Sequence, residues 1–168
     1  MKTIVFDDDP TGSQTVNSCT LLLQWDKNEL LKALRNNSLL FILGNTRSLT
    51  PDVAKQRTRE ICHALLSALQ ENKLFLEDVF IVSRGDSTLR GHGFLEPYTI
   101  NEELGPFDAT FHIPAFFEGD RVTINGIHFL NNIPVHKTSF AKDKIFSYST
   151  SFLPDWLEEK SDGKIKSE

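Results

Sequence analysis

The chain has 168 residues and a formal net charge of −5 at pH 7, and 39% of its residues are hydrophobic. This length suits one domain with its own core, and the negative charge argues against a nucleic-acid-binding surface. No apolar run approaches the length of a membrane span, and a strand pattern begins almost at the N-terminus, so we expect neither a membrane span nor a signal peptide. Its two cysteines lack metal-ligand spacing. We therefore expect a cytoplasmic protein that binds neither nucleic acid nor membrane.

Apolar runs alternate with amphipathic segments in the first half of the chain. Four runs have the length and β-branched content of buried strands: residues 3–6, 19–23, 39–43 and 79–82. Helices are predicted over residues 29–35 and from Thr50 to about Glu71, with Thr50 as N-cap and Pro51 in the first helical position. This alternation predicts an α/β fold in three layers with a largely parallel sheet.

The second half of the chain mixes helix, strand and turn signals. A helix is predicted over residues 91–102, although Pro97 would lie inside it, and a strand over residues 109–113. Asn125 and Gly126 separate two β-rich triplets, which is the strongest short signal for a β-hairpin. A helix over residues 155–160 is closed by Gly163. Residues 163–168 have the pattern of a further strand that is cut off, with a frayed polar tail as the alternative. We therefore expect the chain to be truncated.

The segment from Ser83 to His92 concentrates polar chemistry directly after the apolar run 79–82. It holds two arginines, one aspartate, three hydroxyl side chains and two glycines. Arginine suits carboxylate or phosphate, and aspartate with serine and threonine suits hydroxyl groups. Ligands of open α/β sheets bind just outside the carboxyl ends of the strands. The segment predicts a site for a small polyhydroxylated anion in the loops at these strand ends, with a solvated polar connector as the alternative.

Three consecutive aspartates, at positions 7, 8 and 9, follow the first apolar run and precede Thr11 and Gly12. Neighbouring carboxylates repel one another unless donors or a cation share the site. They could orient ligand hydroxyls or act as a base. Alternatively, Asp7 and Asp9 could be the nucleophile and general acid of a Mg²⁺-dependent phosphatase of the haloacid-dehalogenase type, with Thr46 as a later motif. That phosphatase needs a further aspartate soon after Asp86, which this sequence lacks. A solvated acidic turn is the third alternative.

Two more polar segments complete the candidate site. Arg47 and Ser48 follow the run 39–43, at the same predicted edge of the sheet. Arg47 could complement the aspartates or hold a ligand carboxylate, with simple solvation as the alternative. A possible lid or wall is formed by Gly119, Arg121, Asn125 and Gly126. The histidines form no metal-binding pattern, and neither a phosphate-binding loop nor a dinucleotide fingerprint is present. We expect no metal or nucleotide to be bound by this chain itself.

Together these loops resemble the N-terminal domain of the four-carbon acid sugar kinase family, long catalogued as a family of unknown function. Four segments carry the resemblance in the family's order along nearly the whole chain: Asp8-Asp9-Pro10-Thr11-Gly12 for D-D-x-T-G, residues 84–91 for K-x-D-S-T-L-R-G, residues 114–126 for P-A-x-P…G-R…N-G, and residues 138–143 for T-x-x-A-x-D. Two positions depart from the pattern. Arg84 stands where many members have lysine, and Arg47 is displaced by two positions from the arginine of T-x-S-R.

The resemblance implies an ATP-dependent kinase that acts on acids such as threonate, erythronate or 3-oxo-tetronates. Family members are more than twice as long as this chain. Residues 1–168 would be the acid-sugar-binding domain, inactive alone, and a C-terminal domain of the same polypeptide would bind ATP with Mg²⁺. A small-anion-binding domain without enzymatic activity is the alternative.

On the hypothesis of an acid-sugar-binding domain, we assign roles to individual side chains. Arg84 and Arg90 would hold the substrate carboxylate, with Arg47 assisting. Asp86 and Ser87 would orient hydroxyl groups, and Asp9 or Asp86 would accept the proton of the attacking hydroxyl. The remaining substrate-binding positions are Asp8, Thr11, Ser48, Thr88 and Gly91.

Overall fold

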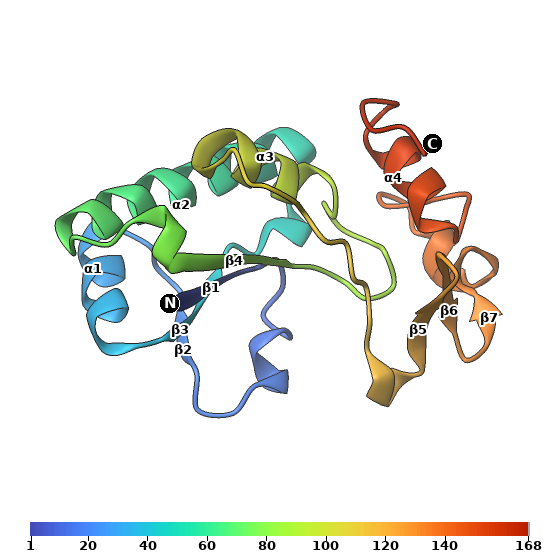
Figure 1. The fold of residues 1–168 in the computed structure, drawn as a ribbon. Coiled ribbons are helices and arrows are strands. Elements are labelled where there is room, and N and C mark those ends of the chain that lie inside the picture. Colours follow the sequence, from blue (N-terminus) through green and yellow to red (C-terminus); the bar gives the residue numbers. More distant parts are fainter. Residues whose placement is uncertain (168) are drawn as a thin grey trace. The chain divides into compact units, whose positions relative to one another are not determined.

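The computed structural model describes residues 1–167, which form two compact units (Figure 1). Unit 1 comprises Met1–Arg84 and Glu96–Asp108, and unit 2 comprises Gly85–Leu95 and Ala109–Glu168. Short 3-10 helices occur in both units: η1 Ser13–Thr15, η2 Thr46–Ser48, η3 Leu76–Asp78, η4 Phe117–Gly119, η5 Val135–Lys137 and η6 Ser139–Lys142. No helix within the described part of the chain is long and apolar enough to cross a membrane.

Unit 1 is built on a four-stranded parallel sheet in the order β2-β3-β1-β4. Its strands are β1 Lys2–Asp7, β2 Thr20–Leu22, β3 Leu39–Leu43 and β4 Val79–Arg84. In the pairing register, Asp7 lies opposite Leu43 on one side and Arg84 on the other. These three strands therefore end at one edge of the sheet, where the loops that follow β1 and β3 also begin.

Three helices pack against this sheet: α1 Lys27–Asn36, α2 Pro51–Glu71 and α3 Leu95–Leu104. The carboxylate of Asp26 caps α1 by accepting hydrogen bonds from the backbone N–H groups of Asn28 and Glu29. Pro51 opens α2, as predicted. Pro97 lies in the first turn of α3, where the backbone N–H groups have no partner inside the helix, so it does not interrupt the helix.

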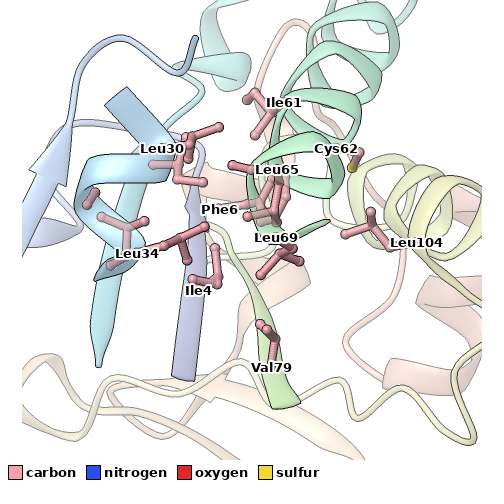
Figure 2. Packing of buried hydrophobic residues seen from close by; sticks show 14 of the residues in the cluster. Ile4, Phe6, Leu30, Leu34, Ile61, Cys62, Leu65, Leu69, Val79 and Leu104 are labelled. Atoms are coloured by element: carbon pink, nitrogen blue, oxygen red, sulfur yellow. The ribbon is translucent and has the colours of Figure 1, made fainter. Parts of the chain in front are cut away.

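The core of unit 1 lies between the helices and one face of the sheet (Figure 2). Alternate strand residues face the same side, so Ile4 and Phe6 of β1 share a face with their partners in β3. Packed against them are Leu30 and Leu34 of α1, Ile61, Leu65 and Leu69 of α2, and Ile100 and Leu104 of α3. Helices α1, α2 and α3 therefore share one core with the sheet. The connections through α1 and through α2 advance in the same direction across the sheet.

Unit 2 contains a three-stranded antiparallel sheet and one helix. The elements are β5 Arg121–Ile124, β6 Ile127–Leu130, β7 Ile133–Pro134 and α4 Leu153–Lys160. Asn125 and Gly126 join β5 to β6 with φ angles of 51° and 78°, as the predicted tight hairpin turn requires. The core of the unit consists of Leu89, Val135, Ala141, Tyr148, Leu153 and Trp156.

The α/β class, the parallel sheet and the hairpin are confirmed, but two predicted strands are wrong. Residues 109–113 form no strand, and Phe111 and Ile113 are 83% and 77% exposed. High β-propensity makes a strand only where a neighbour supplies hydrogen bonds. Residues 164–167 are irregular because the chain turns back onto α4, where the Glu158 carboxylate accepts hydrogen bonds from Lys166 and Ser167. Residue 168 lies outside the described part.

Candidate functional site

The candidate residues fall into two groups, one in each unit. Unit 1 holds Asp8, Asp9, Thr11, Arg47, Ser48 and Arg84, and unit 2 holds Asp86, Ser87, Thr88, Arg90, Gly91, Gly119, Arg121, Asn125 and Gly126. We name two features by their residues. The acidic cluster consists of Asp7, Asp8, Asp9, Arg47, Arg84 and Glu96, and the DSTLRG loop consists of residues 86–91. That both groups serve one ligand stays a prediction.

In the acidic cluster, Arg47 holds Asp8 at two points. Its Nε donates to Asp8 Oδ2 at 2.9 Å and its Nη2 donates to Oδ1 at 2.7 Å. The backbone N–H of Arg47 also donates to the Asp8 carbonyl oxygen at 3.2 Å. Asp8 is only 1% exposed, and its burial raises the pKa of its carboxyl group even though Arg47 acts in the opposite direction. Arg47 therefore anchors the loop after β1.

Asp7 is the most enclosed carboxylate of the cluster. Its side chain is 0% exposed, and Oδ1 accepts a long hydrogen bond from Arg84 Nη1 at 3.4 Å. Burial raises its pKa, although Arg84 and the backbone N–H groups of Asp9 and Ser13 act against this. No donor among the described residues reaches Oδ2 in hydrogen-bonding geometry. A nucleophile must meet its substrate, so this enclosure argues against the phosphatase alternative.

Gly12 allows the loop to close over Asp7. A Cβ atom at this position would lie 2.2 Å from Asp7 Oδ1 and 2.6 Å from Arg84 Nη1. No side chain larger than hydrogen fits between these groups. The glycine of the motif is therefore explained by close packing against a buried ion pair.

Asp9 differs from its two neighbours because it is partly open to solvent. Its side chain is 26% exposed, and Oδ1 accepts hydrogen bonds from the backbone N–H and the hydroxyl of Thr11 at 2.8 and 2.5 Å. Burial alone would raise the pKa of Asp9, but these bonds and the nearby arginines lower it overall. Asp9 is thus the aspartate best able to accept hydrogen bonds from a ligand. Ser48, in contrast, is exposed and donates to the Asn45 carbonyl oxygen at 2.9 Å.

Glu96 belongs to the cluster but was missed in the sequence. It lies in the first turn of α3, is 5% exposed, and accepts a hydrogen bond from the Thr46 hydroxyl at 2.8 Å. Burial, together with the charge of Asp8, raises its pKa to about 8. Its spacing could have indicated that it is buried. Glu96, Ile100 and Leu104 recur every four residues on the buried face of the helix.

In the DSTLRG loop, Asp86 is the centre of the hydrogen bonding. It accepts hydrogen bonds from the Thr88 backbone N–H at 3.1 Å, from Arg90 Nε at 2.7 Å, and from the Thr88 hydroxyl. Burial would raise the pKa of Asp86, but these donors lower it overall. The Arg90 guanidinium also lies 4.8 Å from the centre of the Phe140 ring. Asp86 and Phe140 thus fix the plane of the arginine.

The backbone of this loop is strained and anchored. Leu89 has a φ angle of 65°, which is unusual for leucine, and Gly91 has one of 92°. The Leu89 side chain is 2% exposed in the core of unit 2, and its N–H donates to the Asp86 carbonyl oxygen at 3.0 Å. Strain of this kind persists only where surrounding contacts compensate for it.

The β5–β6 hairpin supports the same loop through Ser87. His128 Nε2 lies 2.7 Å from the Ser87 carbonyl oxygen, and its Nδ1 lies 2.9 Å from the Thr123 hydroxyl. Arg121 Nη1 donates to the Ser87 hydroxyl at 3.3 Å. His128 is fully buried, and burial lowers its pKa, which favours the neutral ring. The sequence did not single out His128, because a lone histidine on a strand carries no motif.

The predicted lid residues have packing explanations. A Cβ at Gly119 would lie 2.5 Å from the Phe116 ring, and one at Gly126 would lie 2.6 Å from Phe152. Arg121 lies 5.3 Å from the centre of the Phe116 ring. With Asn125 in the hairpin turn, none of these positions needs a ligand to explain its residue type. Their role as a lid stays a prediction.

Within residues 1–167, no group of three or more His, Cys, Asp or Glu side chains is arranged to hold a metal ion. Among the candidate site residues, Asp9 and Asp86 have lowered pKa values, and both accept hydrogen bonds from neighbouring donors of the chain.

Comparison with known proteins gives one family and a consistent fold. A family model described as "Sugar-binding N-terminal domain" matches residues 3–168. Over 105 residues the chain is 30% identical to a D-erythronate kinase from Heliobacterium modesticaldum. The aligned region covers 62% of this chain and 22% of that protein. The chain thus spans about a fifth of the length of this relative.

Two solved structures show the same fold. One is a domain of unknown function (DUF1537) from Bordetella bronchiseptica, a domain-swapped dimer with bound citrate. It has a TM-score of 0.71 and 24% identity, and the match covers 93% of this chain and 40% of that one. The other is a DUF1537 protein from Haemophilus influenzae, with a TM-score of 0.67 and 17% identity. This match covers 94% of our chain and 38% of the Haemophilus chain. Because the family model matches almost every residue, the chain belongs to the sugar-binding N-terminal domains of the four-carbon acid sugar kinase family, formerly DUF1537.

Proposed function

We propose that this chain is the substrate-binding domain of an ATP-dependent kinase for four-carbon acid sugars such as erythronate, threonate or a 3-oxo-tetronate. The observation that carries the proposal is the fixed guanidinium of Arg90 in the DSTLRG loop, held by Asp86 and Phe140. Membership of the family supports the ligand class. ATP and Mg²⁺ would be bound by a C-terminal domain of the same polypeptide, and this chain alone would transfer no phosphate.

Arg90 is arranged to receive a carboxylate. Its Nε makes both short hydrogen bonds, to Asp86 at 2.7 Å and to the Thr88 hydroxyl at 3.0 Å. Its Nη1 is 3.9 Å from Asp143 Oδ2, beyond hydrogen-bonding distance. The terminal nitrogens therefore make no short bond to a carboxylate among the described residues. A ligand carboxylate would gain two parallel charge-assisted bonds to a guanidinium whose orientation is already fixed.

Arg84 is the proposed anion contact of unit 1. Its side chain is 30% exposed, and its bond to Asp7 is long at 3.4 Å. Arg47 is less suited to this role, because it is 19% exposed and committed to Asp8.

The hydroxyl groups of the sugar acid would be recognised by carboxylates. The pKa values of Asp9 and Asp86 are both lowered, so both are ionised near neutral pH and accept hydrogen bonds. One of them would receive the proton of the attacking hydroxyl. A low pKa makes a weak base, but phosphoryl transfer depends mainly on positioning and charge stabilisation.

A thermal-unfolding panel tests this function. The 168-residue chain is heated with D-erythronate, threonate, phosphate or ATP, each with and without Mg²⁺. A ligand at about 100 times its Kd adds about 2.7 kcal/mol and raises Tm by several degrees. We expect the sugar acids to raise Tm and ATP to leave it unchanged. A rise with phosphate and Mg²⁺ alone would favour the phosphatase, and no rise with any sugar acid would contradict the proposal.

Two variants test whether the rise in Tm depends on Arg90. Arg90→Met should abolish the rise with D-erythronate. Arg35→Met is the matched control, because Arg35 lies in α1 and contacts Asn72, remote in sequence from the DSTLRG loop. A sugar-acid response that survives in Arg90→Met would remove Arg90 from the binding site.

A further inference from the structure

The acidic cluster buries more negative than positive charge. Asp7, Asp8 and Glu96 are 1%, 1% and 5% exposed. The cationic groups that pair with them are Arg47 and Arg84. If all three carboxylates were ionised, one buried negative charge would lack a counterion, and such a charge is costly in a protein interior. One proton held by the cluster removes this charge.

The contacts indicate which carboxyl group holds that proton. Asp8 accepts two bonds from Arg47, and Asp7 is paired with Arg84. Glu96 accepts a hydrogen bond only from a neutral group among the described residues, the Thr46 hydroxyl at 2.8 Å. The ionised form is therefore least supported at Glu96. Its raised pKa, about 8, agrees with this assignment.

The other charged groups near α3 have partners of their own. From the end of β1, Asp7 and Asp8 face Glu96 and raise its pKa, and from η2 Arg47 lowers it. The charged side chains of α2 that reach α3, namely Lys55, Arg59 and His63, pair with Glu102 and Glu103. Arg57 donates to the Gly44 carbonyl oxygen at 3.1 Å. These α2 groups are engaged by Glu102, Glu103 and the Gly44 carbonyl oxygen, so they leave the proton of Glu96 in place.

We propose that Glu96 is a positioning residue whose neutral carboxyl group fixes the turn Thr46–Ser48 and thereby holds Arg47 on Asp8. Thr46 is the first residue of η2, is 1% exposed, and directly precedes Arg47. Ionised Glu96 repels Asp8 and attracts Arg47 away from it. Deprotonation therefore loosens the two-point contact that anchors the loop after β1.

The first experiment measures the free energy of unfolding in urea between pH 5 and pH 9.5. A carboxyl group whose pKa is raised on folding stabilises the folded state most at low pH, and this contribution is lost as pH rises from its ordinary 4.5 to about 8. Glu96→Gln stays neutral and should lack this part of the decline. Glu102→Gln, on the exposed side of α3, is the control and should keep it. An equal decline in wild type and Glu96→Gln would overturn the proposal.

Two further measurements do not depend on Glu96→Gln folding. Carboxyl ¹³C NMR of the wild-type chain should give a titration midpoint for Glu96 near 8, and a midpoint near the ordinary 4.5 would overturn the proposal. Hydrogen exchange of the Arg47 Nε–H group reports the positioning. Its protection, measured against free arginine at the same pH, should fall above that midpoint in wild type and be low at every pH in Thr46→Val. Exchange that is unchanged in both would show that Glu96 does not position Arg47.

Ligand binding extends the test and rests on the proposed function. An acid sugar bound at the cluster adds negative charge, so its affinity should be higher when Glu96 is protonated. The affinity of wild type for D-erythronate should fall as pH rises through about 8, and that of Glu96→Gln should not. A decline of equal size in both proteins would overturn the coupling. Absence of binding in both would contradict the proposed function, while the unfolding and NMR results would still decide the role of Glu96.

Discussion

Tyr148 donates its hydroxyl hydrogen to the backbone carbonyl oxygen of Thr88 at 2.7 Å, joining positions 60 residues apart. Tyr148 is 6% exposed in the core of unit 2, and its burial raises the pKa of the phenol. The DSTLRG loop is therefore anchored through its backbone, while its side chains hold one another. The backbone anchor and the side-chain network can be tested separately.

The backbone anchor is tested by Tyr148→Phe. This substitution keeps the ring and leaves the buried carbonyl of Thr88 without its partner, which costs about 1–3 kcal/mol. We expect the midpoint of urea unfolding to fall accordingly, and the affinity for D-erythronate to fall with it. A variant as stable as wild type would show that water replaces the hydroxyl.

The side-chain network is tested by Asp86→Asn under acid. The pKa of Asp86 is lowered on folding, so its carboxylate stabilises the folded state above its ordinary pKa of 3.8, and this is lost as pH falls through the lowered value. At pH 7 we expect the variant to be less stable by about 1.5–3 kcal/mol, the usual contribution of hydrogen bonds to a charged group. Urea unfolding from pH 7 to pH 2 should show the two proteins converging in acid.

The exposed Asp108 provides a control for this measurement. Asp108→Asn should follow the wild-type curve at every pH. Curves for wild type and Asp86→Asn that stay parallel down to pH 2 would show that Asp86 is not ionised in the folded chain.

The pair of Asp8 and Arg47 is tested by a double-mutant cycle. Removing one partner of a buried ion pair leaves an uncompensated charge and costs about 3–5 kcal/mol. Arg47→Met should therefore be strongly destabilising, and adding Asp8→Asn should recover part of the loss. Urea unfolding of the four proteins gives the coupling energy. Arg59→Met, which removes a more exposed pair with Glu103, should cost less than about 1 kcal/mol.

The close packing of Gly12 is tested by Gly12→Ala. The added methyl group would overlap Asp7 Oδ1 and displace the loop after β1, and overpacking of this kind costs about 1–3 kcal/mol. Gly44→Ala is the matched control in the next loop. A Cβ there has its nearest contact at 3.3 Å, with Thr46 Cγ2. Equal stability of the two variants would show that the loop after β1 shifts at little cost to accommodate the methyl group.

Much of the fold could be predicted because its signals are local. The runs that became β1, β3 and β4 are apolar over their length, and Asn125 with Gly126 specifies its own turn. Residues 109–113 carry the same kind of signal and form no strand. An apolar run indicates a preference for extended backbone. It becomes a strand only where a neighbouring strand supplies hydrogen-bond partners.

The site was harder to predict, because its organisation depends on pairs distant in sequence. The motifs located Asp8, Arg47 and Asp86, but they did not indicate that Leu89 would adopt a positive φ. Glu96 and His128 act through contacts with residues 50 and 41 positions away. Partners at such separations leave no pattern in one sequence.

The pairing of Asp7 with both Leu43 and Arg84 limits how this chain can change by insertion or deletion. Removing one residue from β1 would exchange its two faces, directing an aspartate to the side where Phe6 now packs. A residue gained in the turn after β3 leaves that alternation intact. Changes of length are therefore confined to the loops that carry the candidate ligand contacts, so specificity can diverge while the core stays constant.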